Sequence, residues 1–260
     1  MKVIIAGYGW SGCKAIELLH REHEVFVYTH PAPWYISSVL NYCKRIQVPC
    51  SVEDISASKL PFRPDVIASV HYRNLIKQHV IEACEARIFN LHPSLLPKYR
   101  GCSSLTWALI NGECKAGFTF HYIDQGCDTG DILLQREVDI EEFDTQATLV
   151  NRVMFEAMKY FMTAFELASI RRAGKPQVGL GSYYRRGCPH GGVIHPEWDD
   201  VTVERFIRAM ANPPLPVATY MGRSVYTIEE FRTIRDETPE WKKSPSITYP
   251  DVTPGENSTR

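Results

Sequence analysis

Strand-like and helix-like segments alternate from Lys2 to His92, and this alternation constrains the fold more than any other feature. Short apolar, β-branched runs predict buried strands at residues 2–7, 24–30, 65–70 and 87–92. Helical spacing predicts helices between them, at residues 13–21, 35–46 and 74–85. Strands that alternate with helices favour a doubly wound α/β domain, with a mostly parallel sheet covered by helices on both faces.

The chain beyond His92 departs from this regular alternation. The pattern predicts a loop, a short helix, two strands and one long helix, at residues 93–104, 105–111, 117–124, 131–140 and 145–172. Gly174 and Pro176 are helix stop signals, so they end the long helix. We therefore expect the first domain to span residues 1–178.

The rest of the chain predicts a small α+β module and a tail. The module is expected over residues 179–236, with a helix at 201–211 and a strand at 224–228. Residues 237–260 are rich in proline, serine, threonine and charge, which is typical of a flexible tail.

Composition narrows the classes of function. The net charge of -1 lacks the basic excess expected of a protein that binds nucleic acid avidly. The eight cysteines form no C-x-x-C pair, and neither they nor the histidines show zinc-ligand spacing, so we expect no metal. No apolar run resembles a signal peptide or a membrane span. These observations favour a cytoplasmic protein without a membrane partner.

A glycine motif follows the first predicted strand. Residues 7–12 read G-Y-G-W-S-G, which fits the G-x-G-x-x-G fingerprint of dinucleotide-binding turns. That fingerprint requires an acidic residue after the second strand, where this chain has Tyr28, Thr29 and His30. A nicotinamide-dependent oxidoreductase is therefore the weaker alternative. The turn can instead shape the start of a helix, or lie near another ligand's phosphate with Trp10 stacking on that ligand.

Asn90 and His92 end the fourth predicted strand. Side chains two apart in a strand share one face, and Pro93 ends the pairing directly after them. An amide and an imidazole are thus expected together at the carboxyl end of a parallel strand, where open α/β sheets place their sites. Either residue taken alone is more typical of a structural polar side chain whose hydrogen bonds are made within the fold.

A second polar segment, D-Q-G-C-D-T-G-D at residues 124–131, joins the next two predicted strands. Taken alone, it reads as a hairpin turn with solvated acids. Together with N-x-H-P-S-L-L-P-x-Y-R-G, W-A-L-I-N-G-E and G-F-T-F-H at residues 90–101, 107–113 and 117–121, it resembles the formyltransferases that use 10-formyltetrahydrofolate. The resemblance implies the Rossmann-like formyltransferase fold.

The resemblance implies that Asn90, His92 and Asp128 are the catalytic set. An amide can donate to an oxyanion, an imidazole can take a proton near neutral pH, and a carboxylate can orient that imidazole. The division of roles between His92 and Asp128 stays open. In this family the pterin lies against the main chain of two loops, which implies donor contacts at Tyr72, Arg73, Leu75, Asp124 and Asp128.

The carboxyl-terminal third is similar to that of sugar-nucleotide N-formyltransferases. The shared segments are Y-Y-R-R-G-C-P, I-H-P-E-W and F-I-R-A-M-A-N-P-P at residues 183–189, 194–198 and 206–214. The similarity implies a nucleotide-linked amino-deoxy sugar as acceptor, as used for O-antigen and other surface polysaccharides, and a homodimer. Candidate substrate contacts are Trp10, Ser94, Lys98, Arg100, Gly101, Arg185 and Arg186.

Other acceptors and other classes of protein remain as alternatives. Methionyl-tRNA formyltransferases carry a larger, basic carboxyl-terminal barrel, and glycinamide ribonucleotide formyltransferases open with S-G-x-G-S-N where this chain has A-G-Y-G-W-S-G. A non-catalytic binding domain is a further alternative, but such a domain has no physical reason to keep all three catalytic residue types.

Overall fold

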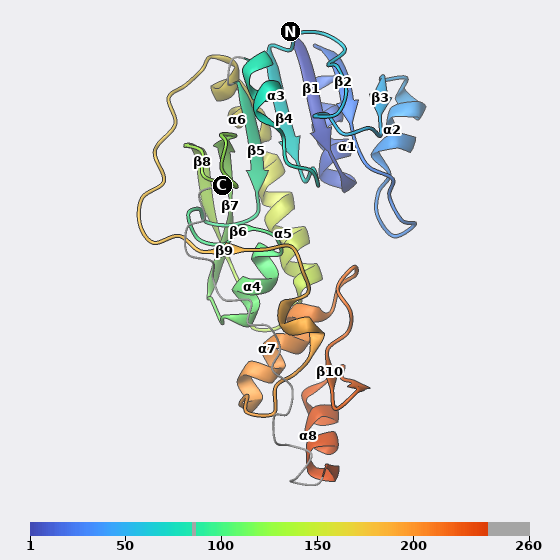
Figure 1. Ribbon diagram of the computed structural model, residues 1–260, viewed down its shortest axis with the longest axis vertical. Helices are drawn as coiled ribbons and strands as arrows, with labels where there is room; N and C mark the ends of the chain where they lie inside the picture. Colours follow the sequence, from blue (N-terminus) through green and yellow to red (C-terminus); the bar gives the residue numbers. More distant parts are fainter. Residues whose placement is uncertain (85–86, 239–260) are drawn as a thin grey trace. The chain divides into compact units, whose positions relative to one another are not determined.

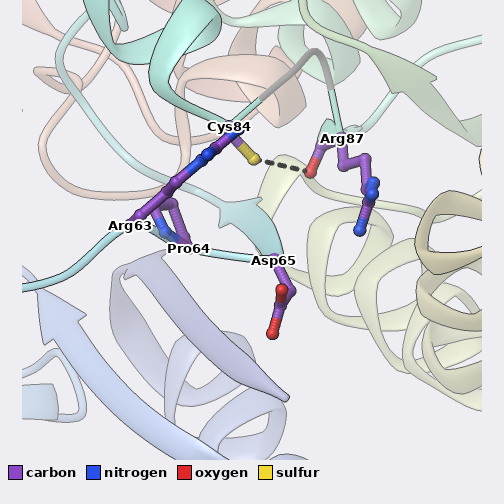
Figure 2. A pocket seen from close by; sticks show the side chains of 5 residues that line it. All are labelled: Arg63, Pro64, Asp65, Cys84 and Arg87. Carbon is purple, nitrogen blue, oxygen red and sulfur yellow. Dashed lines mark hydrogen bonds between the residues drawn. The ribbon is translucent and has the colours of Figure 1, made fainter.

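The structure, a computed structural model, describes residues 1–84 and 87–238 (Figure 1). Their contacts group them into two compact units, which are described separately. The first unit is made of Met1–Pro97, Gly117–Glu137 and Val153–Leu180. The second is made of Lys98–Ala116, Val138–Arg152 and the residues from Gly181 onward. The domain boundary expected between residues 178 and 179 assumes two continuous domains, whereas each of these units is made of separate segments. That boundary stays a prediction.

One seven-stranded sheet forms the frame of the first unit. Its order is β3-β2-β1-β4-β5-β7-β8; neighbouring strands from β3 to β5 are parallel, and β5 runs antiparallel to β7. The strands are β1 Lys2–Gly7, β2 Glu24–Tyr28, β3 Cys50–Ser51, β4 Val66–Val70, β5 Ile88–His92, β7 Lys115–Tyr122 and β8 Ile132–Asp139. The predicted doubly wound, mostly parallel sheet is confirmed.

Helices cover both faces of this sheet. Ile88 and Phe89 are consecutive in β5, so their side chains point to opposite faces. Ile88 packs with Val80 and Ile81 of helix α3 (Gln78–Ala83). Phe89 contacts Phe161, the first residue of α6 (Phe161–Ser169), at 6.0 Å between ring centroids. Helices α1 (Gly9–Leu19) and α2 (Val39–Ile46) complete the amino-terminal half.

The second unit is built on helices and very short strands. Helices α4 (Ser104–Ile110) and α7 (Asp200–Met210) pack together, and α8 (Ile228–Glu237) packs on α7. The ring of Tyr184 stacks between those of Tyr99 and Trp107, at 5.6 and 4.5 Å. The remaining elements are β6 Arg100–Gly101, β9 Tyr183–Tyr184, β10 Thr219–Tyr220, β11 Arg223–Ser224 and a short helix at Pro189–Gly192.

Two predicted elements of the carboxyl-terminal half are wrong. The long helix predicted over 145–172 is divided into α5 (Gln146–Lys159) and α6. The break lies at Tyr160, whose φ of -105° and ψ of 2° leave the helical region and whose N–H bonds the carbonyl of Ala157. The strand predicted over 224–228 is also wrong, because β11 ends at Ser224 and α8 begins at Ile228.

A capping box explains where α8 begins. The Thr227 hydroxyl accepts from the Glu230 N–H at 3.2 Å, and the Glu230 carboxylate accepts from the Thr227 N–H at 3.3 Å. We predict that Thr227→Ala lowers the free energy of unfolding by about 1 kcal/mol, since it leaves an N-terminal amide without its acceptor. Urea unfolding measures the change. The Thr227→Ser control keeps the hydroxyl, and a loss as large as that of alanine would contradict the capping account.

Within the described residues, no helix has the length and apolarity needed to cross a membrane. The predicted tail, residues 237–260, lies outside the described residues beyond Thr238.

Candidate active site

Polar side chains form two neighbouring rows across three strands of the first unit. Asn90 of β5 is in register with Ser69 of β4 on one side and with His121 of β7 on the other. His92 lies two residues farther along β5 and is in register with Thr119. Because residues two apart share a face, both rows lie on the same side of the sheet. The predicted placement of Asn90 and His92 at the carboxyl end of a strand is confirmed.

Hydrogen bonds of the first row fix how the Asn90 amide is turned. His121 Nδ1 lies 2.7 Å from the Tyr122 carbonyl, which can only accept, so Nδ1 carries the proton. In the neutral ring, Nε2 of His121 is therefore an acceptor, and Asn90 Nδ2 lies 3.2 Å from it. The Ser69 hydroxyl donates to Asn90 Oδ1 at 2.8 Å. These contacts give the amide one orientation, with its NH₂ group toward β7.

His92 and Asp128 form the second part of the site. His92 Nδ1 lies 3.4 Å from Asp128 Oδ2, and only 6% of the His92 side chain and 14% of the Asp128 side chain are exposed. The other carboxylate oxygen, Oδ1, lies 3.5 Å from His121 Nε2. The Asp128 carboxylate therefore lies between the two imidazoles, at a place largely withdrawn from water.

The loop that carries Asp128 is held by its own side chains. Asp124 Oδ1 accepts from the Gly126 N–H at 3.0 Å and from the Thr129 hydroxyl at 2.6 Å, which closes a tight turn. The Gln177 amide donates to the carbonyls of Asp128 and Gly130 at 2.8 and 2.9 Å. Asp128 itself has a φ of 54°, a left-handed conformation that aspartate tolerates better than most residues.

His71 lies next to this site, directly after β4. It too has a left-handed φ, of 58°. Burial of its ring, together with the nearby charge of His92, lowers the pKa of His71 from 6.5 to about 4. His71 is therefore neutral at physiological pH.

The lowered pKa of His71 makes the folded state sensitive to acid. As the pH falls from 6.5 to about 4, the unfolded chain binds a proton at this position and the folded chain does not. Stability contributed by neutral His71 is thus complete above pH 6.5 and declines through that window. We predict that His71→Gln flattens this decline in denaturant unfolding measured at several pH values. The exposed His79→Gln control should keep the wild-type slope, and an unchanged slope in His71→Gln would contradict the assignment.

The predicted donor-binding residues lie on two loops of the first unit. The Tyr72 hydroxyl accepts from the Ile55 N–H at 3.1 Å, and its ring stacks on His30 at 4.5 Å. The Arg73 guanidinium lies over the Tyr8 ring at 5.5 Å, and the Leu75 side chain is exposed. Asp124 uses its carboxylate to hold the loop of Asp128. None of these contacts contradicts a role for the main chain of either loop.

The predicted substrate contacts are divided between the two units. Trp10, in α1, and Ser94, which is buried after β5, belong to the first unit. Lys98, Arg100, Gly101, Arg185 and Arg186 belong to the second. There Lys98 Nζ lies 3.5 Å from Glu113 Oε1, and β6 pairs with β9 so that Arg100 and Gly101 are in register with Tyr183 and Tyr184. Arg185 and Arg186, directly after β9, are exposed.

Comparison with known proteins decides the family. The family model described as "Formyl transferase" matches residues 42–165. The crystal structure of the formyltransferase PseJ from Anoxybacillus kamchatkensis is 30% identical and covers 71% of this chain and 86% of that chain, with a TM-score of 0.52. The chain belongs to the formyl transferase family.

Two further comparisons concern curated relatives from Brucella and a solved structure with the same fold. GDP-perosamine N-formyltransferases from Brucella melitensis and Brucella abortus are 45% identical over 157 residues, which are 60% of this chain and 61% of the relatives. The matched segment thus spans less than two thirds of those proteins. The N-formyltransferase from Helicobacter canadensis has the same fold, with a TM-score of 0.75 at 20% identity over 87% of this chain and 86% of that chain.

The structure adds four residues that sequence reasoning did not select for the site of this formyl transferase. They are the cross-strand neighbours Ser69, Thr119 and His121 and the strand-end residue His71. The Thr119 hydroxyl donates to the Ser94 carbonyl at 2.6 Å and accepts from Gln135 at 2.8 Å, which anchors the segment after His92. The sequence does contain a signal for two of them. Thr119 and His121 are two apart in G-F-T-F-H, so an apolar strand carries two polar side chains on one face.

Proposed function

We propose that this protein transfers the formyl group of 10-formyltetrahydrofolate to the amine of a nucleotide-linked amino-deoxy sugar. The proposed acceptor is of the kind of a GDP- or dTDP-linked 4-amino-4,6-dideoxyhexose, a sugar used for O-antigen or another surface polysaccharide. The observation that carries the proposal is the convergence of Asn90, His92 and Asp128 at the carboxyl edge of the sheet.

The three side chains match the chemistry that formyl transfer needs. When the amine attacks the formyl carbon, negative charge develops on the formyl oxygen, and Asn90 Nδ2 is a donor for that oxygen. Because His92 Nδ1 faces Asp128, the opposite nitrogen, Nε2, is the one suited to take the proton from the amine. Asp128 then stabilises the imidazolium by its charge.

The donor site is proposed on the two loops that flank this set. We assign the pterin to the main chain of residues 71–76 and 124–128, with Tyr72, Arg73, Leu75, Asp124 and Asp128 as the residues concerned. Support comes from the Helicobacter canadensis enzyme, whose structure contains folinic acid and dTDP-3-aminofucose. The Anoxybacillus kamchatkensis structure contains tetrahydrofolate and UDP-4,6-dideoxy-4-formamido-L-AltNAc.

The proposed class of acceptor is supported by the names of two relatives from Brucella. The Brucella proteins that are 45% identical over 157 residues are named for formylation of GDP-perosamine. Trp10, Ser94, Lys98, Arg100, Gly101, Arg185 and Arg186 remain the proposed acceptor contacts. Among them Arg185 and Arg186 are exposed guanidinium groups of the kind that binds phosphate. We also propose that the protein acts as a homodimer in the cytoplasm.

A substrate panel tests the proposal. Purified protein is mixed with 10-formyltetrahydrofolate and, separately, GDP-, dTDP- and UDP-linked 4-amino or 3-amino sugars, glycinamide ribonucleotide and methionyl-tRNA, and tetrahydrofolate release is followed. We expect turnover with at least one nucleotide sugar and none with the last two acceptors. Turnover with glycinamide ribonucleotide or methionyl-tRNA alone would overturn the acceptor assignment.

A further inference from the structure

Two aromatic side chains project from the loop between β2 and α2. As whole residues, Trp34 is 95% exposed and Tyr35 is 44% exposed. Their rings meet edge to face, with centroids 5.6 Å apart and planes at 89°. Pro31 and Pro33 precede them and restrict the backbone of the loop. Such a loop presents a large flat ring at low cost in conformational entropy.

This loop lies at the edge of the sheet where ligands are expected. It leaves the carboxyl end of β2, next to the point where the strand order reverses between β1 and β4. Open α/β sheets bind their ligands outside the carboxyl ends of strands, at such a reversal. The loop also adjoins the glycine-rich turn, because a Cβ placed on Gly9 would lie 3.8 Å from Ile36 Cγ2.

A cationic and aromatic cluster occupies the reversal itself. Tyr8 follows β1, and its N–H donates to the Val70 carbonyl at the end of β4 at 3.0 Å. The Tyr8 ring lies 6.0 Å from that of His30 and 5.5 Å from the Arg73 guanidinium. His30 Nε2 accepts from the Arg73 N–H at 3.2 Å, so neutral His30 carries its proton on Nδ1. The cluster thus contains a guanidinium and an imidazole, two kinds of group that bind phosphate oxygens in proteins.

The same cluster is connected to the catalytic set through the chain. His71 precedes Tyr72 and Arg73 and is close enough to His92 to feel its charge. On the other side, three residues separate His30 from Trp34, a stretch that spans at most roughly 14 Å. Short stretches of chain thus join this cluster to the catalytic set on one side and to the exposed aromatic pair on the other.

We propose that Trp34 and Tyr35 bind the base of the acceptor nucleotide, and that Arg73 and His30 bind its diphosphate. This inference rests on the proposed function, because it gives the nucleotide part of that acceptor a place. It does not compete with the pterin assignment, which uses the main chain of residues 71–76, whereas the Arg73 side chain turns toward Tyr8. The chemical class bound is a nucleoside diphosphate.

Titrations with GDP and with inorganic pyrophosphate test the proposal by calorimetry. Trp34→Ala should raise the Kd for GDP by about 5- to 150-fold, the range measured for loss of one base–aromatic stack, and leave the Kd for pyrophosphate unchanged. Trp34→Phe should keep most of the affinity. Arg73→Ala should weaken the binding of both GDP and pyrophosphate. Phe143→Ala, which removes another highly exposed aromatic ring, is the matched control and should bind as wild type does.

The outcomes separate this inference from the proposed function. If Trp34→Ala binds GDP as tightly as wild type, or wild type binds none of GDP, UDP and dTDP, the inference is wrong. If wild type formylates a nucleotide sugar while Trp34→Ala keeps the wild-type KM for it, the function stands and the inference falls. If GDP binding depends on Trp34 but no nucleotide sugar is formylated, the nucleotide site stands and the function falls.

Discussion

His92→Ala is expected to lower kcat by about 10²- to 10⁴-fold, the usual contribution of a positioned general base. The imidazole is buried, and its Nδ1 faces Asp128 at 3.4 Å. In the variant, a neighbouring water can take the proton from the amine only weakly, and the Asp128 carboxylate loses its contact with His92 Nδ1. The drop is measured from tetrahydrofolate release at saturating donor and acceptor.

Two further variants separate chemistry from folding. His92→Gln keeps a polar side chain of similar length but cannot take a proton near neutral pH, so it should lose as much activity as alanine. His79→Gln changes an exposed histidine of α3 and should keep the wild-type rate. Far-ultraviolet circular dichroism should be the same for all three. Wild-type rates in a folded His92→Gln variant would show that His92 is not the base.

Asn90→Ala is expected to lower kcat by about 10²- to 10³-fold, as loss of one oxyanion donor does. The orientation of the amide is the reason, since Ser69 donates to Oδ1 and Nδ2 is the end turned toward β7. The bond to the formyl oxygen strengthens only as charge develops, so KM for donor and acceptor should change little. Steady-state kinetics with each substrate varied in turn checks both parts.

A charge-changing variant sharpens this prediction. Asn90→Asp keeps the shape of the side chain but places a negative charge beside the developing oxyanion, so it should be slower than Asn90→Ala. Asn151→Ala, at an exposed position of α5, controls for the loss of an amide elsewhere. If Asn90→Ala raised KM and left kcat unchanged, Asn90 would bind substrate without stabilising the transition state.

The positions of Asn90 and His92 could be predicted because they depend on local sequence patterns. A buried β-branched run, a period of two and a proline directly afterwards are enough to put Asn90 and His92 on one face at a strand end. Their cross-strand partners depend on register instead. His121 lies 31 positions from Asn90 in the chain, and no local signal states which residue of β7 will stand opposite β5.

The wrong elements also have physical causes. Residues 224–228 contain valine, tyrosine and threonine, which favour strands, yet the pairing of Thr227 with Glu230 is a helix-start signal that prevailed. The helical period continues through Tyr160, but its ring packs on Phe118 at 5.8 Å while its backbone leaves the helix. Tertiary packing of this kind overrides a weak local preference.

The reaction we propose moves a formyl group to the amine of a nucleotide sugar. The most direct measurement uses 10-formyltetrahydrofolate with an isotopically labelled formyl carbon and GDP-perosamine, with mass spectrometry and NMR of the product. We predict a labelled formamide carbon on the sugar nitrogen, formed by wild type and absent with His92→Gln. Label that stays in the folate or leaves as free formate, with the sugar amine unchanged, would contradict it.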